Sequence, residues 1–238
     1  MVKESEPFEV VPFTIVRDSN EGTGFQFTGI KGRSKNGVRL PQIIRITEKA
    51  MWAMDRKEWG RQRWGDESLG VGLADYSIEG HEYEIQIERK SIPDLFGTLA
   101  SRRDNFEREI DRLSIQCRWS CVMIEGGYSH ILTYKESGLD PASVVGTITA
   151  WSQRYPNVHW IPAGSRDMAE RLTFRMLERF WLDREEKIKQ DAKSQKSQKT
   201  TTSKTEGSTS NGPVIESIEK AEQGNQVGRT EPVGDRSN

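Results

Sequence analysis

The chain has 238 residues, of which 34% are hydrophobic and 30% charged, and its formal net charge is −1. This length allows one ordinary domain with extensions or two small domains, and the near-zero charge excludes binding of nucleic acid or membranes through global charge. No apolar run approaches the roughly 20 residues that span a bilayer, and the first ten residues lack the apolar core of a signal peptide. Only two cysteines occur, Cys117 and Cys121, which indicates a reducing compartment without a disulfide framework. We therefore expect a cytoplasmic, intracellular protein with no membrane partner.

The aromatic residues divide the chain into a folded part and a tail. All seven Trp, eight Phe and five Tyr precede residue 185. The remainder is rich in Lys, Ser, Thr and Gln, and cannot bury enough apolar surface to offset its ordering entropy. We predict a flexible N-terminus over 1–10, one domain over 11–184 and a disordered low-complexity tail over 185–238. The lysines between 187 and 204 either add salt-sensitive affinity for DNA or only keep the tail soluble.

The first part of the predicted domain contains a strand, a loop and a Trp-rich segment. Residues 11–16 are rich in β-forming residues and predict a strand that ends at a polar turn. Residues 28–41 are glycine-rich and predict a loop. A Trp-rich insertion over about 43–70 follows, within which Thr47 is a candidate helix cap. Its three tryptophans either stack on unpaired bases or, as we favour, pack the insertion onto the core.

The second part alternates between strands and helices. Residues 73–78 and 82–90 predict a hairpin, and the second strand alternates between apolar residues and a polar face. Apolar residues at helical spacing predict one long helix over 93–116, and residues 119–124 predict a strand buried on both faces. A helix begins at Asp140–Pro141, residues 158–161 form a strand, and Ser165 caps a final helix that ends near residue 184. This order predicts an α/β domain with a mixed β-sheet flanked by helices.

Two carboxylates and a lysine lie on the predicted hairpin. Glu88 and Lys90 are two residues apart on a strand, so both side chains leave the same face. Asp75 on the preceding strand joins them if the pairing is suitably staggered. Two carboxylates can hold a hard cation such as Mg²⁺, and an adjacent lysine can offset charge on a phosphate transition state. The alternative is a solvated strand edge, on which charged residues discourage aggregation.

The motifs around this hairpin resemble those of the XPF-type structure-specific endonucleases. The run from Glu88 to Asp94 matches the ERKxxxD motif, and Asp75–Tyr76 matches the end of the GDY motif. The polar turn at 18–21 lies where the family has Asp-x-Arg-Glu, and the segments 95–103 and 121–126 resemble its helix and its apolar strand ending in Glu-Gly. The resemblance covers about residues 11–184 and is nearest to the short bacterial and phage members.

This resemblance implies a restriction-endonuclease-like fold and a metal site formed by Asp75 and Glu88. Mg²⁺ is the expected cofactor, for which Mn²⁺ can substitute, and Lys90 is the expected catalytic lysine. The other site residues that it implies are Asp18 and Glu21 in the same cleft, with Arg89 and Asp94 supporting the site through ion pairs or phosphate contacts.

Three features depart from the family pattern. Asn20 stands where the family has Arg, which removes a guanidinium suited to bidentate phosphate binding. Ala74 replaces Gly, which is tolerated if its φ is negative. No helix-hairpin-helix module follows the domain, so the substrate preference of larger relatives does not carry over.

We expect the function of a metal-dependent DNA endonuclease acting on branched or single-strand-containing DNA in repair, recombination or phage DNA processing. Candidates for DNA backbone contacts are Lys31 and Arg33 in the glycine-rich loop, with Lys35 nearby, and Arg102 and Arg103 on the long helix. A homodimer stays open. The rival hypothesis, kept open by Asn20, is a nuclease-like fold that binds DNA or a partner without cutting it.

Overall fold

The computed structural model describes residues 8–32 and 37–205, with side chains described as far as residue 195. The chain divides into two units, Met1–Gln190 and Asp191–Asn238. The described elements, in chain order, are β1 (Glu9–Asp18), β2 (Gln42–Lys49), the short 3-10 helix η1 (Met51–Ala53), α1 (Arg56–Trp64), the 3-10 helix η2 (Glu67–Leu69), β3 (Tyr76–Ile78), β4 (Ile85–Lys90), α2 (Ile92–Ser101), α3 (Arg103–Gln116), β5 (Trp119–Ile124), α4 (Tyr128–Thr133), α5 (Pro141–Arg154), β6 (Val158–Pro162) and α6 (Arg166–Thr205).

The first unit is built on a six-stranded mixed sheet in the order β2-β1-β3-β4-β5-β6. The strands β4, β5 and β6 are parallel to one another, and β3 joins β1 and β4 by antiparallel pairing. The predicted class, a mixed β-sheet flanked by helices, is therefore confirmed.

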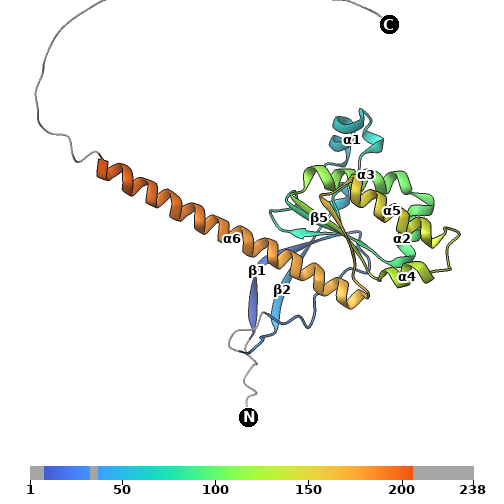
Figure 1. The fold of residues 1–238 in the computed structure, drawn as a ribbon, viewed down its shortest axis with the longest axis horizontal. Coiled ribbons are helices and arrows are strands. Elements are labelled where there is room, and N and C mark those ends of the chain that lie inside the picture. The colour runs from blue at the N-terminus through green and yellow to red at the C-terminus, as the bar shows by residue number, and fades with distance from the viewer. Residues whose placement is uncertain (1–7, 33–36, 206–238) are drawn as a thin grey trace, which may run out of the picture. The chain divides into compact units, whose positions relative to one another are not determined.

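Helices cover both faces of this sheet (Figure 1). On one face, Phe174 and Leu177 of α6 pack with the large side chains of β1, β3 and β4. On the other face, α2, α3 and α5 pack over β5, with Phe106 and Trp151 among the buried residues. Because β4 and β5 are interior strands with helices packed on both faces of the sheet, nearly all of their residues are buried.

The polar face predicted for the second hairpin strand is mostly buried: Glu82, Gln86 and Glu88 are buried, and Glu84 is partly exposed. Gln86 is fully buried, and its side chain accepts from the Ala74 amide at 2.9 Å and donates to the Glu82 carbonyl at 2.7 Å. Within β4 the alternation therefore reflects two buried environments, one of which is polar.

Ala74 stands where the family motif has glycine. It is not among the described residues with positive φ, so its backbone conformation is one that alanine adopts without strain.

Two predicted helix boundaries are wrong. The helix expected over 93–116 is two helices, separated at Arg102, whose φ and ψ of −132° and 29° leave the helical region. The final helix continues past residue 184, because α6 runs to Thr205; residues 206–238 of the predicted tail lie outside the described residues. The predicted caps are confirmed, since Asp140 accepts from the Ala142 amide and Ser165 from the Met168 amide.

The helix predicted from Thr47 is also wrong. Thr47 lies in β2, which pairs with β1 in parallel, and the helix α1 begins only at Arg56. The rest of the segment, from Ala50 to Leu73, folds closely on itself: a Cβ added to Gly72 would meet the Trp52 carbonyl oxygen at 2.0 Å. The fully buried Arg112 of α3 donates to the Val71 carbonyl at 2.6 Å, and its guanidinium lies over the Trp59 ring.

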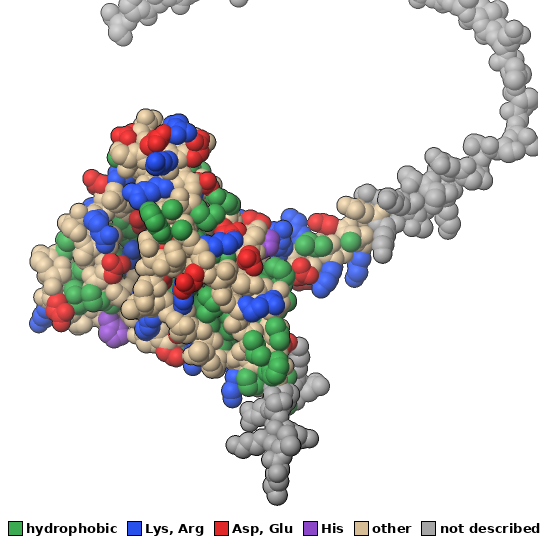
Figure 2. Space-filling view, turned by 180° about the vertical axis from the view of Figure 1, so that it is seen from behind, with side chains coloured by type: hydrophobic (Ala, Val, Ile, Leu, Met, Phe, Trp, Pro, Cys, Tyr) green, Lys and Arg blue, Asp and Glu red, His purple; other side chains and the backbone are tan. Residues whose placement is uncertain are grey.

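The space-filling view shows the segment around α1 projecting from the body of the unit, with charged side chains of both signs on it (Figure 2). These include Arg61, which forms ion pairs with Glu58 and Glu67. Within the described part of the chain, no helix has the length and apolar character needed to cross a membrane. Both cysteines are buried free thiols.

We expect Gly72→Ala to lower the free energy of unfolding by about 1–3 kcal/mol, because the new methyl group overlaps the Trp52 backbone. The matched control is Gly146→Ala on the exposed face of α5, where a Cβ meets nothing within 4 Å. That change should stabilise by up to about 1 kcal/mol, since alanine is the better helix former. Urea unfolding measures both; an unchanged midpoint for Gly72→Ala would show that the close approach is not needed for stability.

Candidate active site

A polar cavity of about 310 Å³ opens between the end of β4, the helix α3 and the segment 52–74. Its lining includes three of the residues predicted to carry the chemistry, Asp75, Glu88 and Lys90. The other residues that line it are Asp18, Trp52, Arg56, Gly70, Val71, Gly72, Leu73, Ala74, Arg102, Asn105, Glu109 and Leu113.

The register of the hairpin brings Asp75 to Glu88. Tyr76 pairs with Ile87 in antiparallel orientation, which sets Asp75 opposite Glu88. The Asp75 carboxylate accepts a hydrogen bond from the Arg89 backbone amide at 2.7 Å. The stagger that the sequence left open is therefore the one that places both carboxylates in one cavity.

Lys90 extends into the same cavity from the end of β4. Its Nζ lies 2.7 Å from Glu88 Oε1 and 3.3 Å from Asp94 Oδ2, and 4.8 Å from the centroid of the Phe106 ring. Burial by itself lowers the pKa of this amine, but the carboxylates of Glu88, Glu109 and Asp75 outweigh it and raise the pKa overall. Lys90 is therefore held as a cation.

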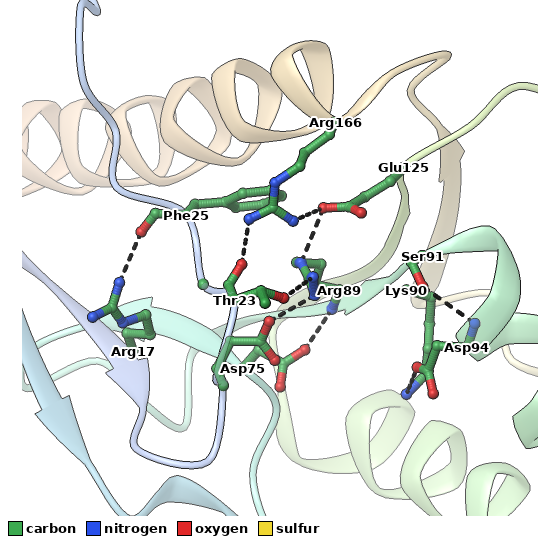
Figure 3. A network of polar contacts seen from close by, with 12 residues as sticks. Arg17, Thr23, Phe25, Asp75, Arg89, Lys90, Ser91, Asp94, Glu125 and Arg166 are labelled. Atoms are coloured by element: carbon green, nitrogen blue, oxygen red, sulfur yellow. Dashed lines mark hydrogen bonds and ion pairs between the residues drawn. The ribbon is translucent and has the colours of Figure 1, made fainter.

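Arg89 leaves the opposite face of β4 and connects three segments (Figure 3). Its guanidinium donates to Glu21 at 2.6 Å, to Thr23 Oγ1 at 2.9 Å and to Glu125 at 3.1 Å. Arg166, at the start of α6, also donates to Glu125 and to the Thr23 carbonyl oxygen. The network ties the turn after β1, the end of β5 and the start of α6 to the strand that carries Glu88.

The residues of the polar turn at 18–21 are divided between the cavity and the Arg89 network. Asp18 is buried and lines the cavity, where its carboxylate accepts from the Trp52 amide at 3.2 Å and its own amide donates to the Asp75 carbonyl at 2.8 Å. Glu21 is not among the lining residues; it forms an ion pair with Arg89 instead. Asn20 is exposed in the turn between them.

The cavity concentrates negative charge. Burial, followed by the neighbouring charges of Glu88 and Glu21, raises the pKa of Asp75 well above its usual range. A divalent cation bound here would offset the repulsion between these carboxylates, so their oxygen atoms suit such an ion. Among the described residues, no group of three or more His, Cys, Asp and Glu side chains is arranged to hold a metal ion. Two carboxylates would leave the other positions of a cation to water and substrate, as is usual for Mg²⁺.

Of a polar stripe along α3 and at its start, the sequence analysis named Arg102 and missed Asn105 and Glu109. Arg102, Asn105 and Glu109 line the cavity at spacings of three and four residues, which place them on one helical face. This spacing was the available signal in the sequence. Glu109 is half-buried, and burial followed by the charge of Glu88 raises its pKa to about 7.

The predicted DNA contacts have different surroundings. Arg102 lines the cavity and pairs with Asp94 at 3.6 Å. Arg103 turns to α5, where it donates to Thr147 and lies over the Trp151 ring. Lys31 is exposed in a bridge with Pro41 and does not line the cavity, while Arg33 and Lys35 lie outside the described residues. Their contacts with DNA stay predictions.

Comparisons with known proteins agree with the motifs. A model of the ERCC4 domain matches residues 47–176, more than half of the chain. A search among curated proteins found no match. The solved structure of XPF from Aeropyrum pernix is 13% identical, with 70% of this chain and 60% of that chain covered and a TM-score of 0.44. XPF from Aeropyrum pernix in complex with DNA is 15% identical, with 59% and 55% covered and a TM-score of 0.39.

The class of this protein follows from these findings. A mixed sheet flanked by helices, with the ERKxxxD motif at the end of its central strand, is the arrangement of an XPF-type nuclease domain. The chain belongs to the ERCC4 domain family. It spans less than two thirds of the length of the two XPF chains that it resembles. Membership of the short bacterial and phage group stays a prediction.

We expect Glu109→Gln to stabilise the metal-free protein at alkaline pH. The pKa of Glu109 is about 7 in the folded protein and 4.5 in its ordinary state. The contribution of Glu109 to the free energy of unfolding is therefore highest below pH 4.5, where the carboxyl is protonated in both states, and it falls as the pH rises from 4.5 through 7. The glutamine variant has no such loss, so its advantage should grow by on the order of 1 kcal/mol between about pH 5 and pH 8. Urea unfolding in a chelator measures it, with the exposed Glu79→Gln as control; a difference that is independent of pH would contradict the assignment.

Proposed function

We propose that this protein is a DNA endonuclease that hydrolyses phosphodiester bonds with a divalent cation, Mg²⁺ or Mn²⁺, held by Asp75 and Glu88. The observation that supports this most directly is the meeting of two carboxylates and a charged lysine in one polar cavity. Membership of the ERCC4 domain family supports the choice of DNA as substrate.

Each residue of the cavity has a proposed role in this reaction. Asp75 and Glu88 hold the cation, which when bound polarises a phosphate oxygen and helps activate the attacking water. Lys90 keeps its proton and places positive charge beside the phosphate, where negative charge builds up in the transition state. Asp94 and Glu88 fix the position of its Nζ from two sides.

Arg89 is a positioning residue in this proposal. Its guanidinium points away from the cavity, and its backbone amide donates to Asp75. Its ion pairs with Glu21 and Glu125 hold β4 in place, so the two carboxylates keep their separation while a cation and a phosphate enter.

The substrate is proposed to be branched or partly single-stranded DNA, with a role in repair, recombination or phage DNA processing. Arg102 and Arg56 lie at the cavity wall and are suited to contact the phosphates on either side of the cleaved bond. A homodimer stays a prediction from the resemblance.

We expect Asp75→Asn, Glu88→Gln and Lys90→Met each to lower cleavage by a factor of about 10² or more, because each removes a charge that acts on the cation or the phosphate. The measurement is single-turnover cleavage of labelled flap, fork and single-stranded DNA with Mg²⁺ and with Mn²⁺.

The matched control is Asp167→Asn, which changes an exposed carboxylate on α6 that pairs with Arg171 and does not line the cavity. It should cut like the wild type, and circular dichroism should show all variants folded. Equal cleavage by the wild type and the Asp75→Asn/Glu88→Gln double variant would overturn the proposal. Binding without cleavage under both cations would favour a module that grips DNA without cutting it.

A further inference from the structure

The three tryptophans of the segment 47–64 have different environments. Trp59 is buried at 7% exposure and lies edge-on to the half-buried Trp64, with the ring centroids 6.1 Å apart. Trp52 is 43% exposed. In the described part of the chain, no aromatic ring and no cation lies against its indole. Trp59 therefore packs the segment onto the unit beneath Arg112, with Trp64 against it, and Trp52 remains exposed.

The backbone of Trp52 is held on several sides. Its amide donates to Asp18, and the preceding Met51 is fully buried beside Val16 and Leu73. The Leu73 amide donates to the Met51 carbonyl at 2.9 Å, and the Gly72 backbone lies close against the Trp52 carbonyl. The backbone from which the exposed side chain extends is thus held before any ligand binds, which lowers the entropy lost on binding.

Trp52 also lies next to the proposed reaction centre. It lines both the active-site cavity and a second cavity of about 650 Å³ beside α1, so it lies in the wall that the two cavities share. Asp18, which accepts from its amide, donates in turn to the Asp75 carbonyl. The Trp52 backbone is therefore linked through Asp18 to the backbone of Asp75, a proposed cation ligand.

A flat, neutral and rigid aromatic surface at this place suits a nucleobase. Stacking on an indole needs no particular base and adds no negative charge to a cavity already rich in carboxylates. Arg56, in both cavity walls, and Arg102 supply positive charge for the adjoining phosphates. In a paired duplex both faces of each base are covered by neighbours, so only an unpaired or splayed base can stack on Trp52.

We propose that Trp52 is a specificity-determining platform that stacks on an unpaired base next to the cleaved phosphate. This inference rests on the proposed nuclease function and narrows its substrate to DNA with a single-stranded nucleotide at the cleavage point.

The test compares Trp52→Ala, Trp52→Phe and the control Tyr128→Ala, which removes a 46% exposed ring from α4, outside both cavities. Binding to a duplex with a single-stranded tail, and to the same duplex fully paired, is measured by fluorescence anisotropy in a chelator. Trp52→Ala should weaken binding of the tailed DNA by about 10-fold to 100-fold and leave the paired duplex unchanged. Trp52→Phe should keep most of the affinity, and Tyr128→Ala all of it.

A second arm uses tailed DNA with one abasic nucleotide moved along the tail. At one position of the tail, the abasic nucleotide should weaken binding by the wild type and should not weaken binding by Trp52→Ala any further. The reason is that deleting the base and deleting the indole abolish the same contact. Equal loss on tailed and paired DNA, no loss at all, or no binding of DNA by wild type would overturn the platform. Cleavage with Mg²⁺ is measured in parallel. If Trp52→Ala selectively loses binding of tailed DNA but the wild type cleaves no DNA, the nuclease function is refuted and the stacking role of Trp52 is supported. If Trp52→Ala cleaves tailed DNA as fast as the wild type, the stacking role is refuted and the nuclease function is supported.

Discussion

The hydrogen bond from the Arg89 amide to Asp75, 2.7 Å long, ties the end of the short strand β3 to the central strand β4. It is possible only in the register that pairs Tyr76 with Ile87, and a slip by one residue would turn every side chain of the strand to the other face. Buried Gln86 supports the same register by binding the Ala74 amide. The meeting of the two carboxylates, and with it the proposed chemistry, depends on this pairing.

The strand alternation also explains why Glu88, Arg89 and Lys90 can stand side by side in a buried place. Glu88 and Lys90 face the cavity and α3, whereas Arg89 faces the start of α6. Each cation lies over an aromatic ring of the core on its own side, Phe106 for Lys90 and Phe25 for Arg89. Each also meets carboxylates, so neither charge is left buried without a partner. One face is thereby available for chemistry, and the other holds the strand in place.

The segment between β2 and β3 completes the cavity. It is held by close backbone approaches at Gly70 and Gly72 and by the buried Arg112, more than by regular structure. The segment therefore forms one wall of the cavity. It places Trp52, which is hydrogen-bonded to Asp18, and the positively charged Arg56 in the same cavity as the carboxylates. In this way residues distant from the ERKxxxD motif in the sequence define the shape of the space in front of it.

The sequence by itself determined the α/β class, the caps of α5 and α6, and the hairpin with its acids and lysine, because these depend on local periodicity and on residue types at short spacing. It did not reveal β2, whose pairing is with a strand some thirty residues away, nor the break at Arg102 that turns α3. Glu109, Glu125 and Arg166 joined the site only through packing between elements far apart in the chain. Tertiary structure decided which of three similar tryptophans remained exposed, since burial depends on what folds against a side chain and not on the side chain itself.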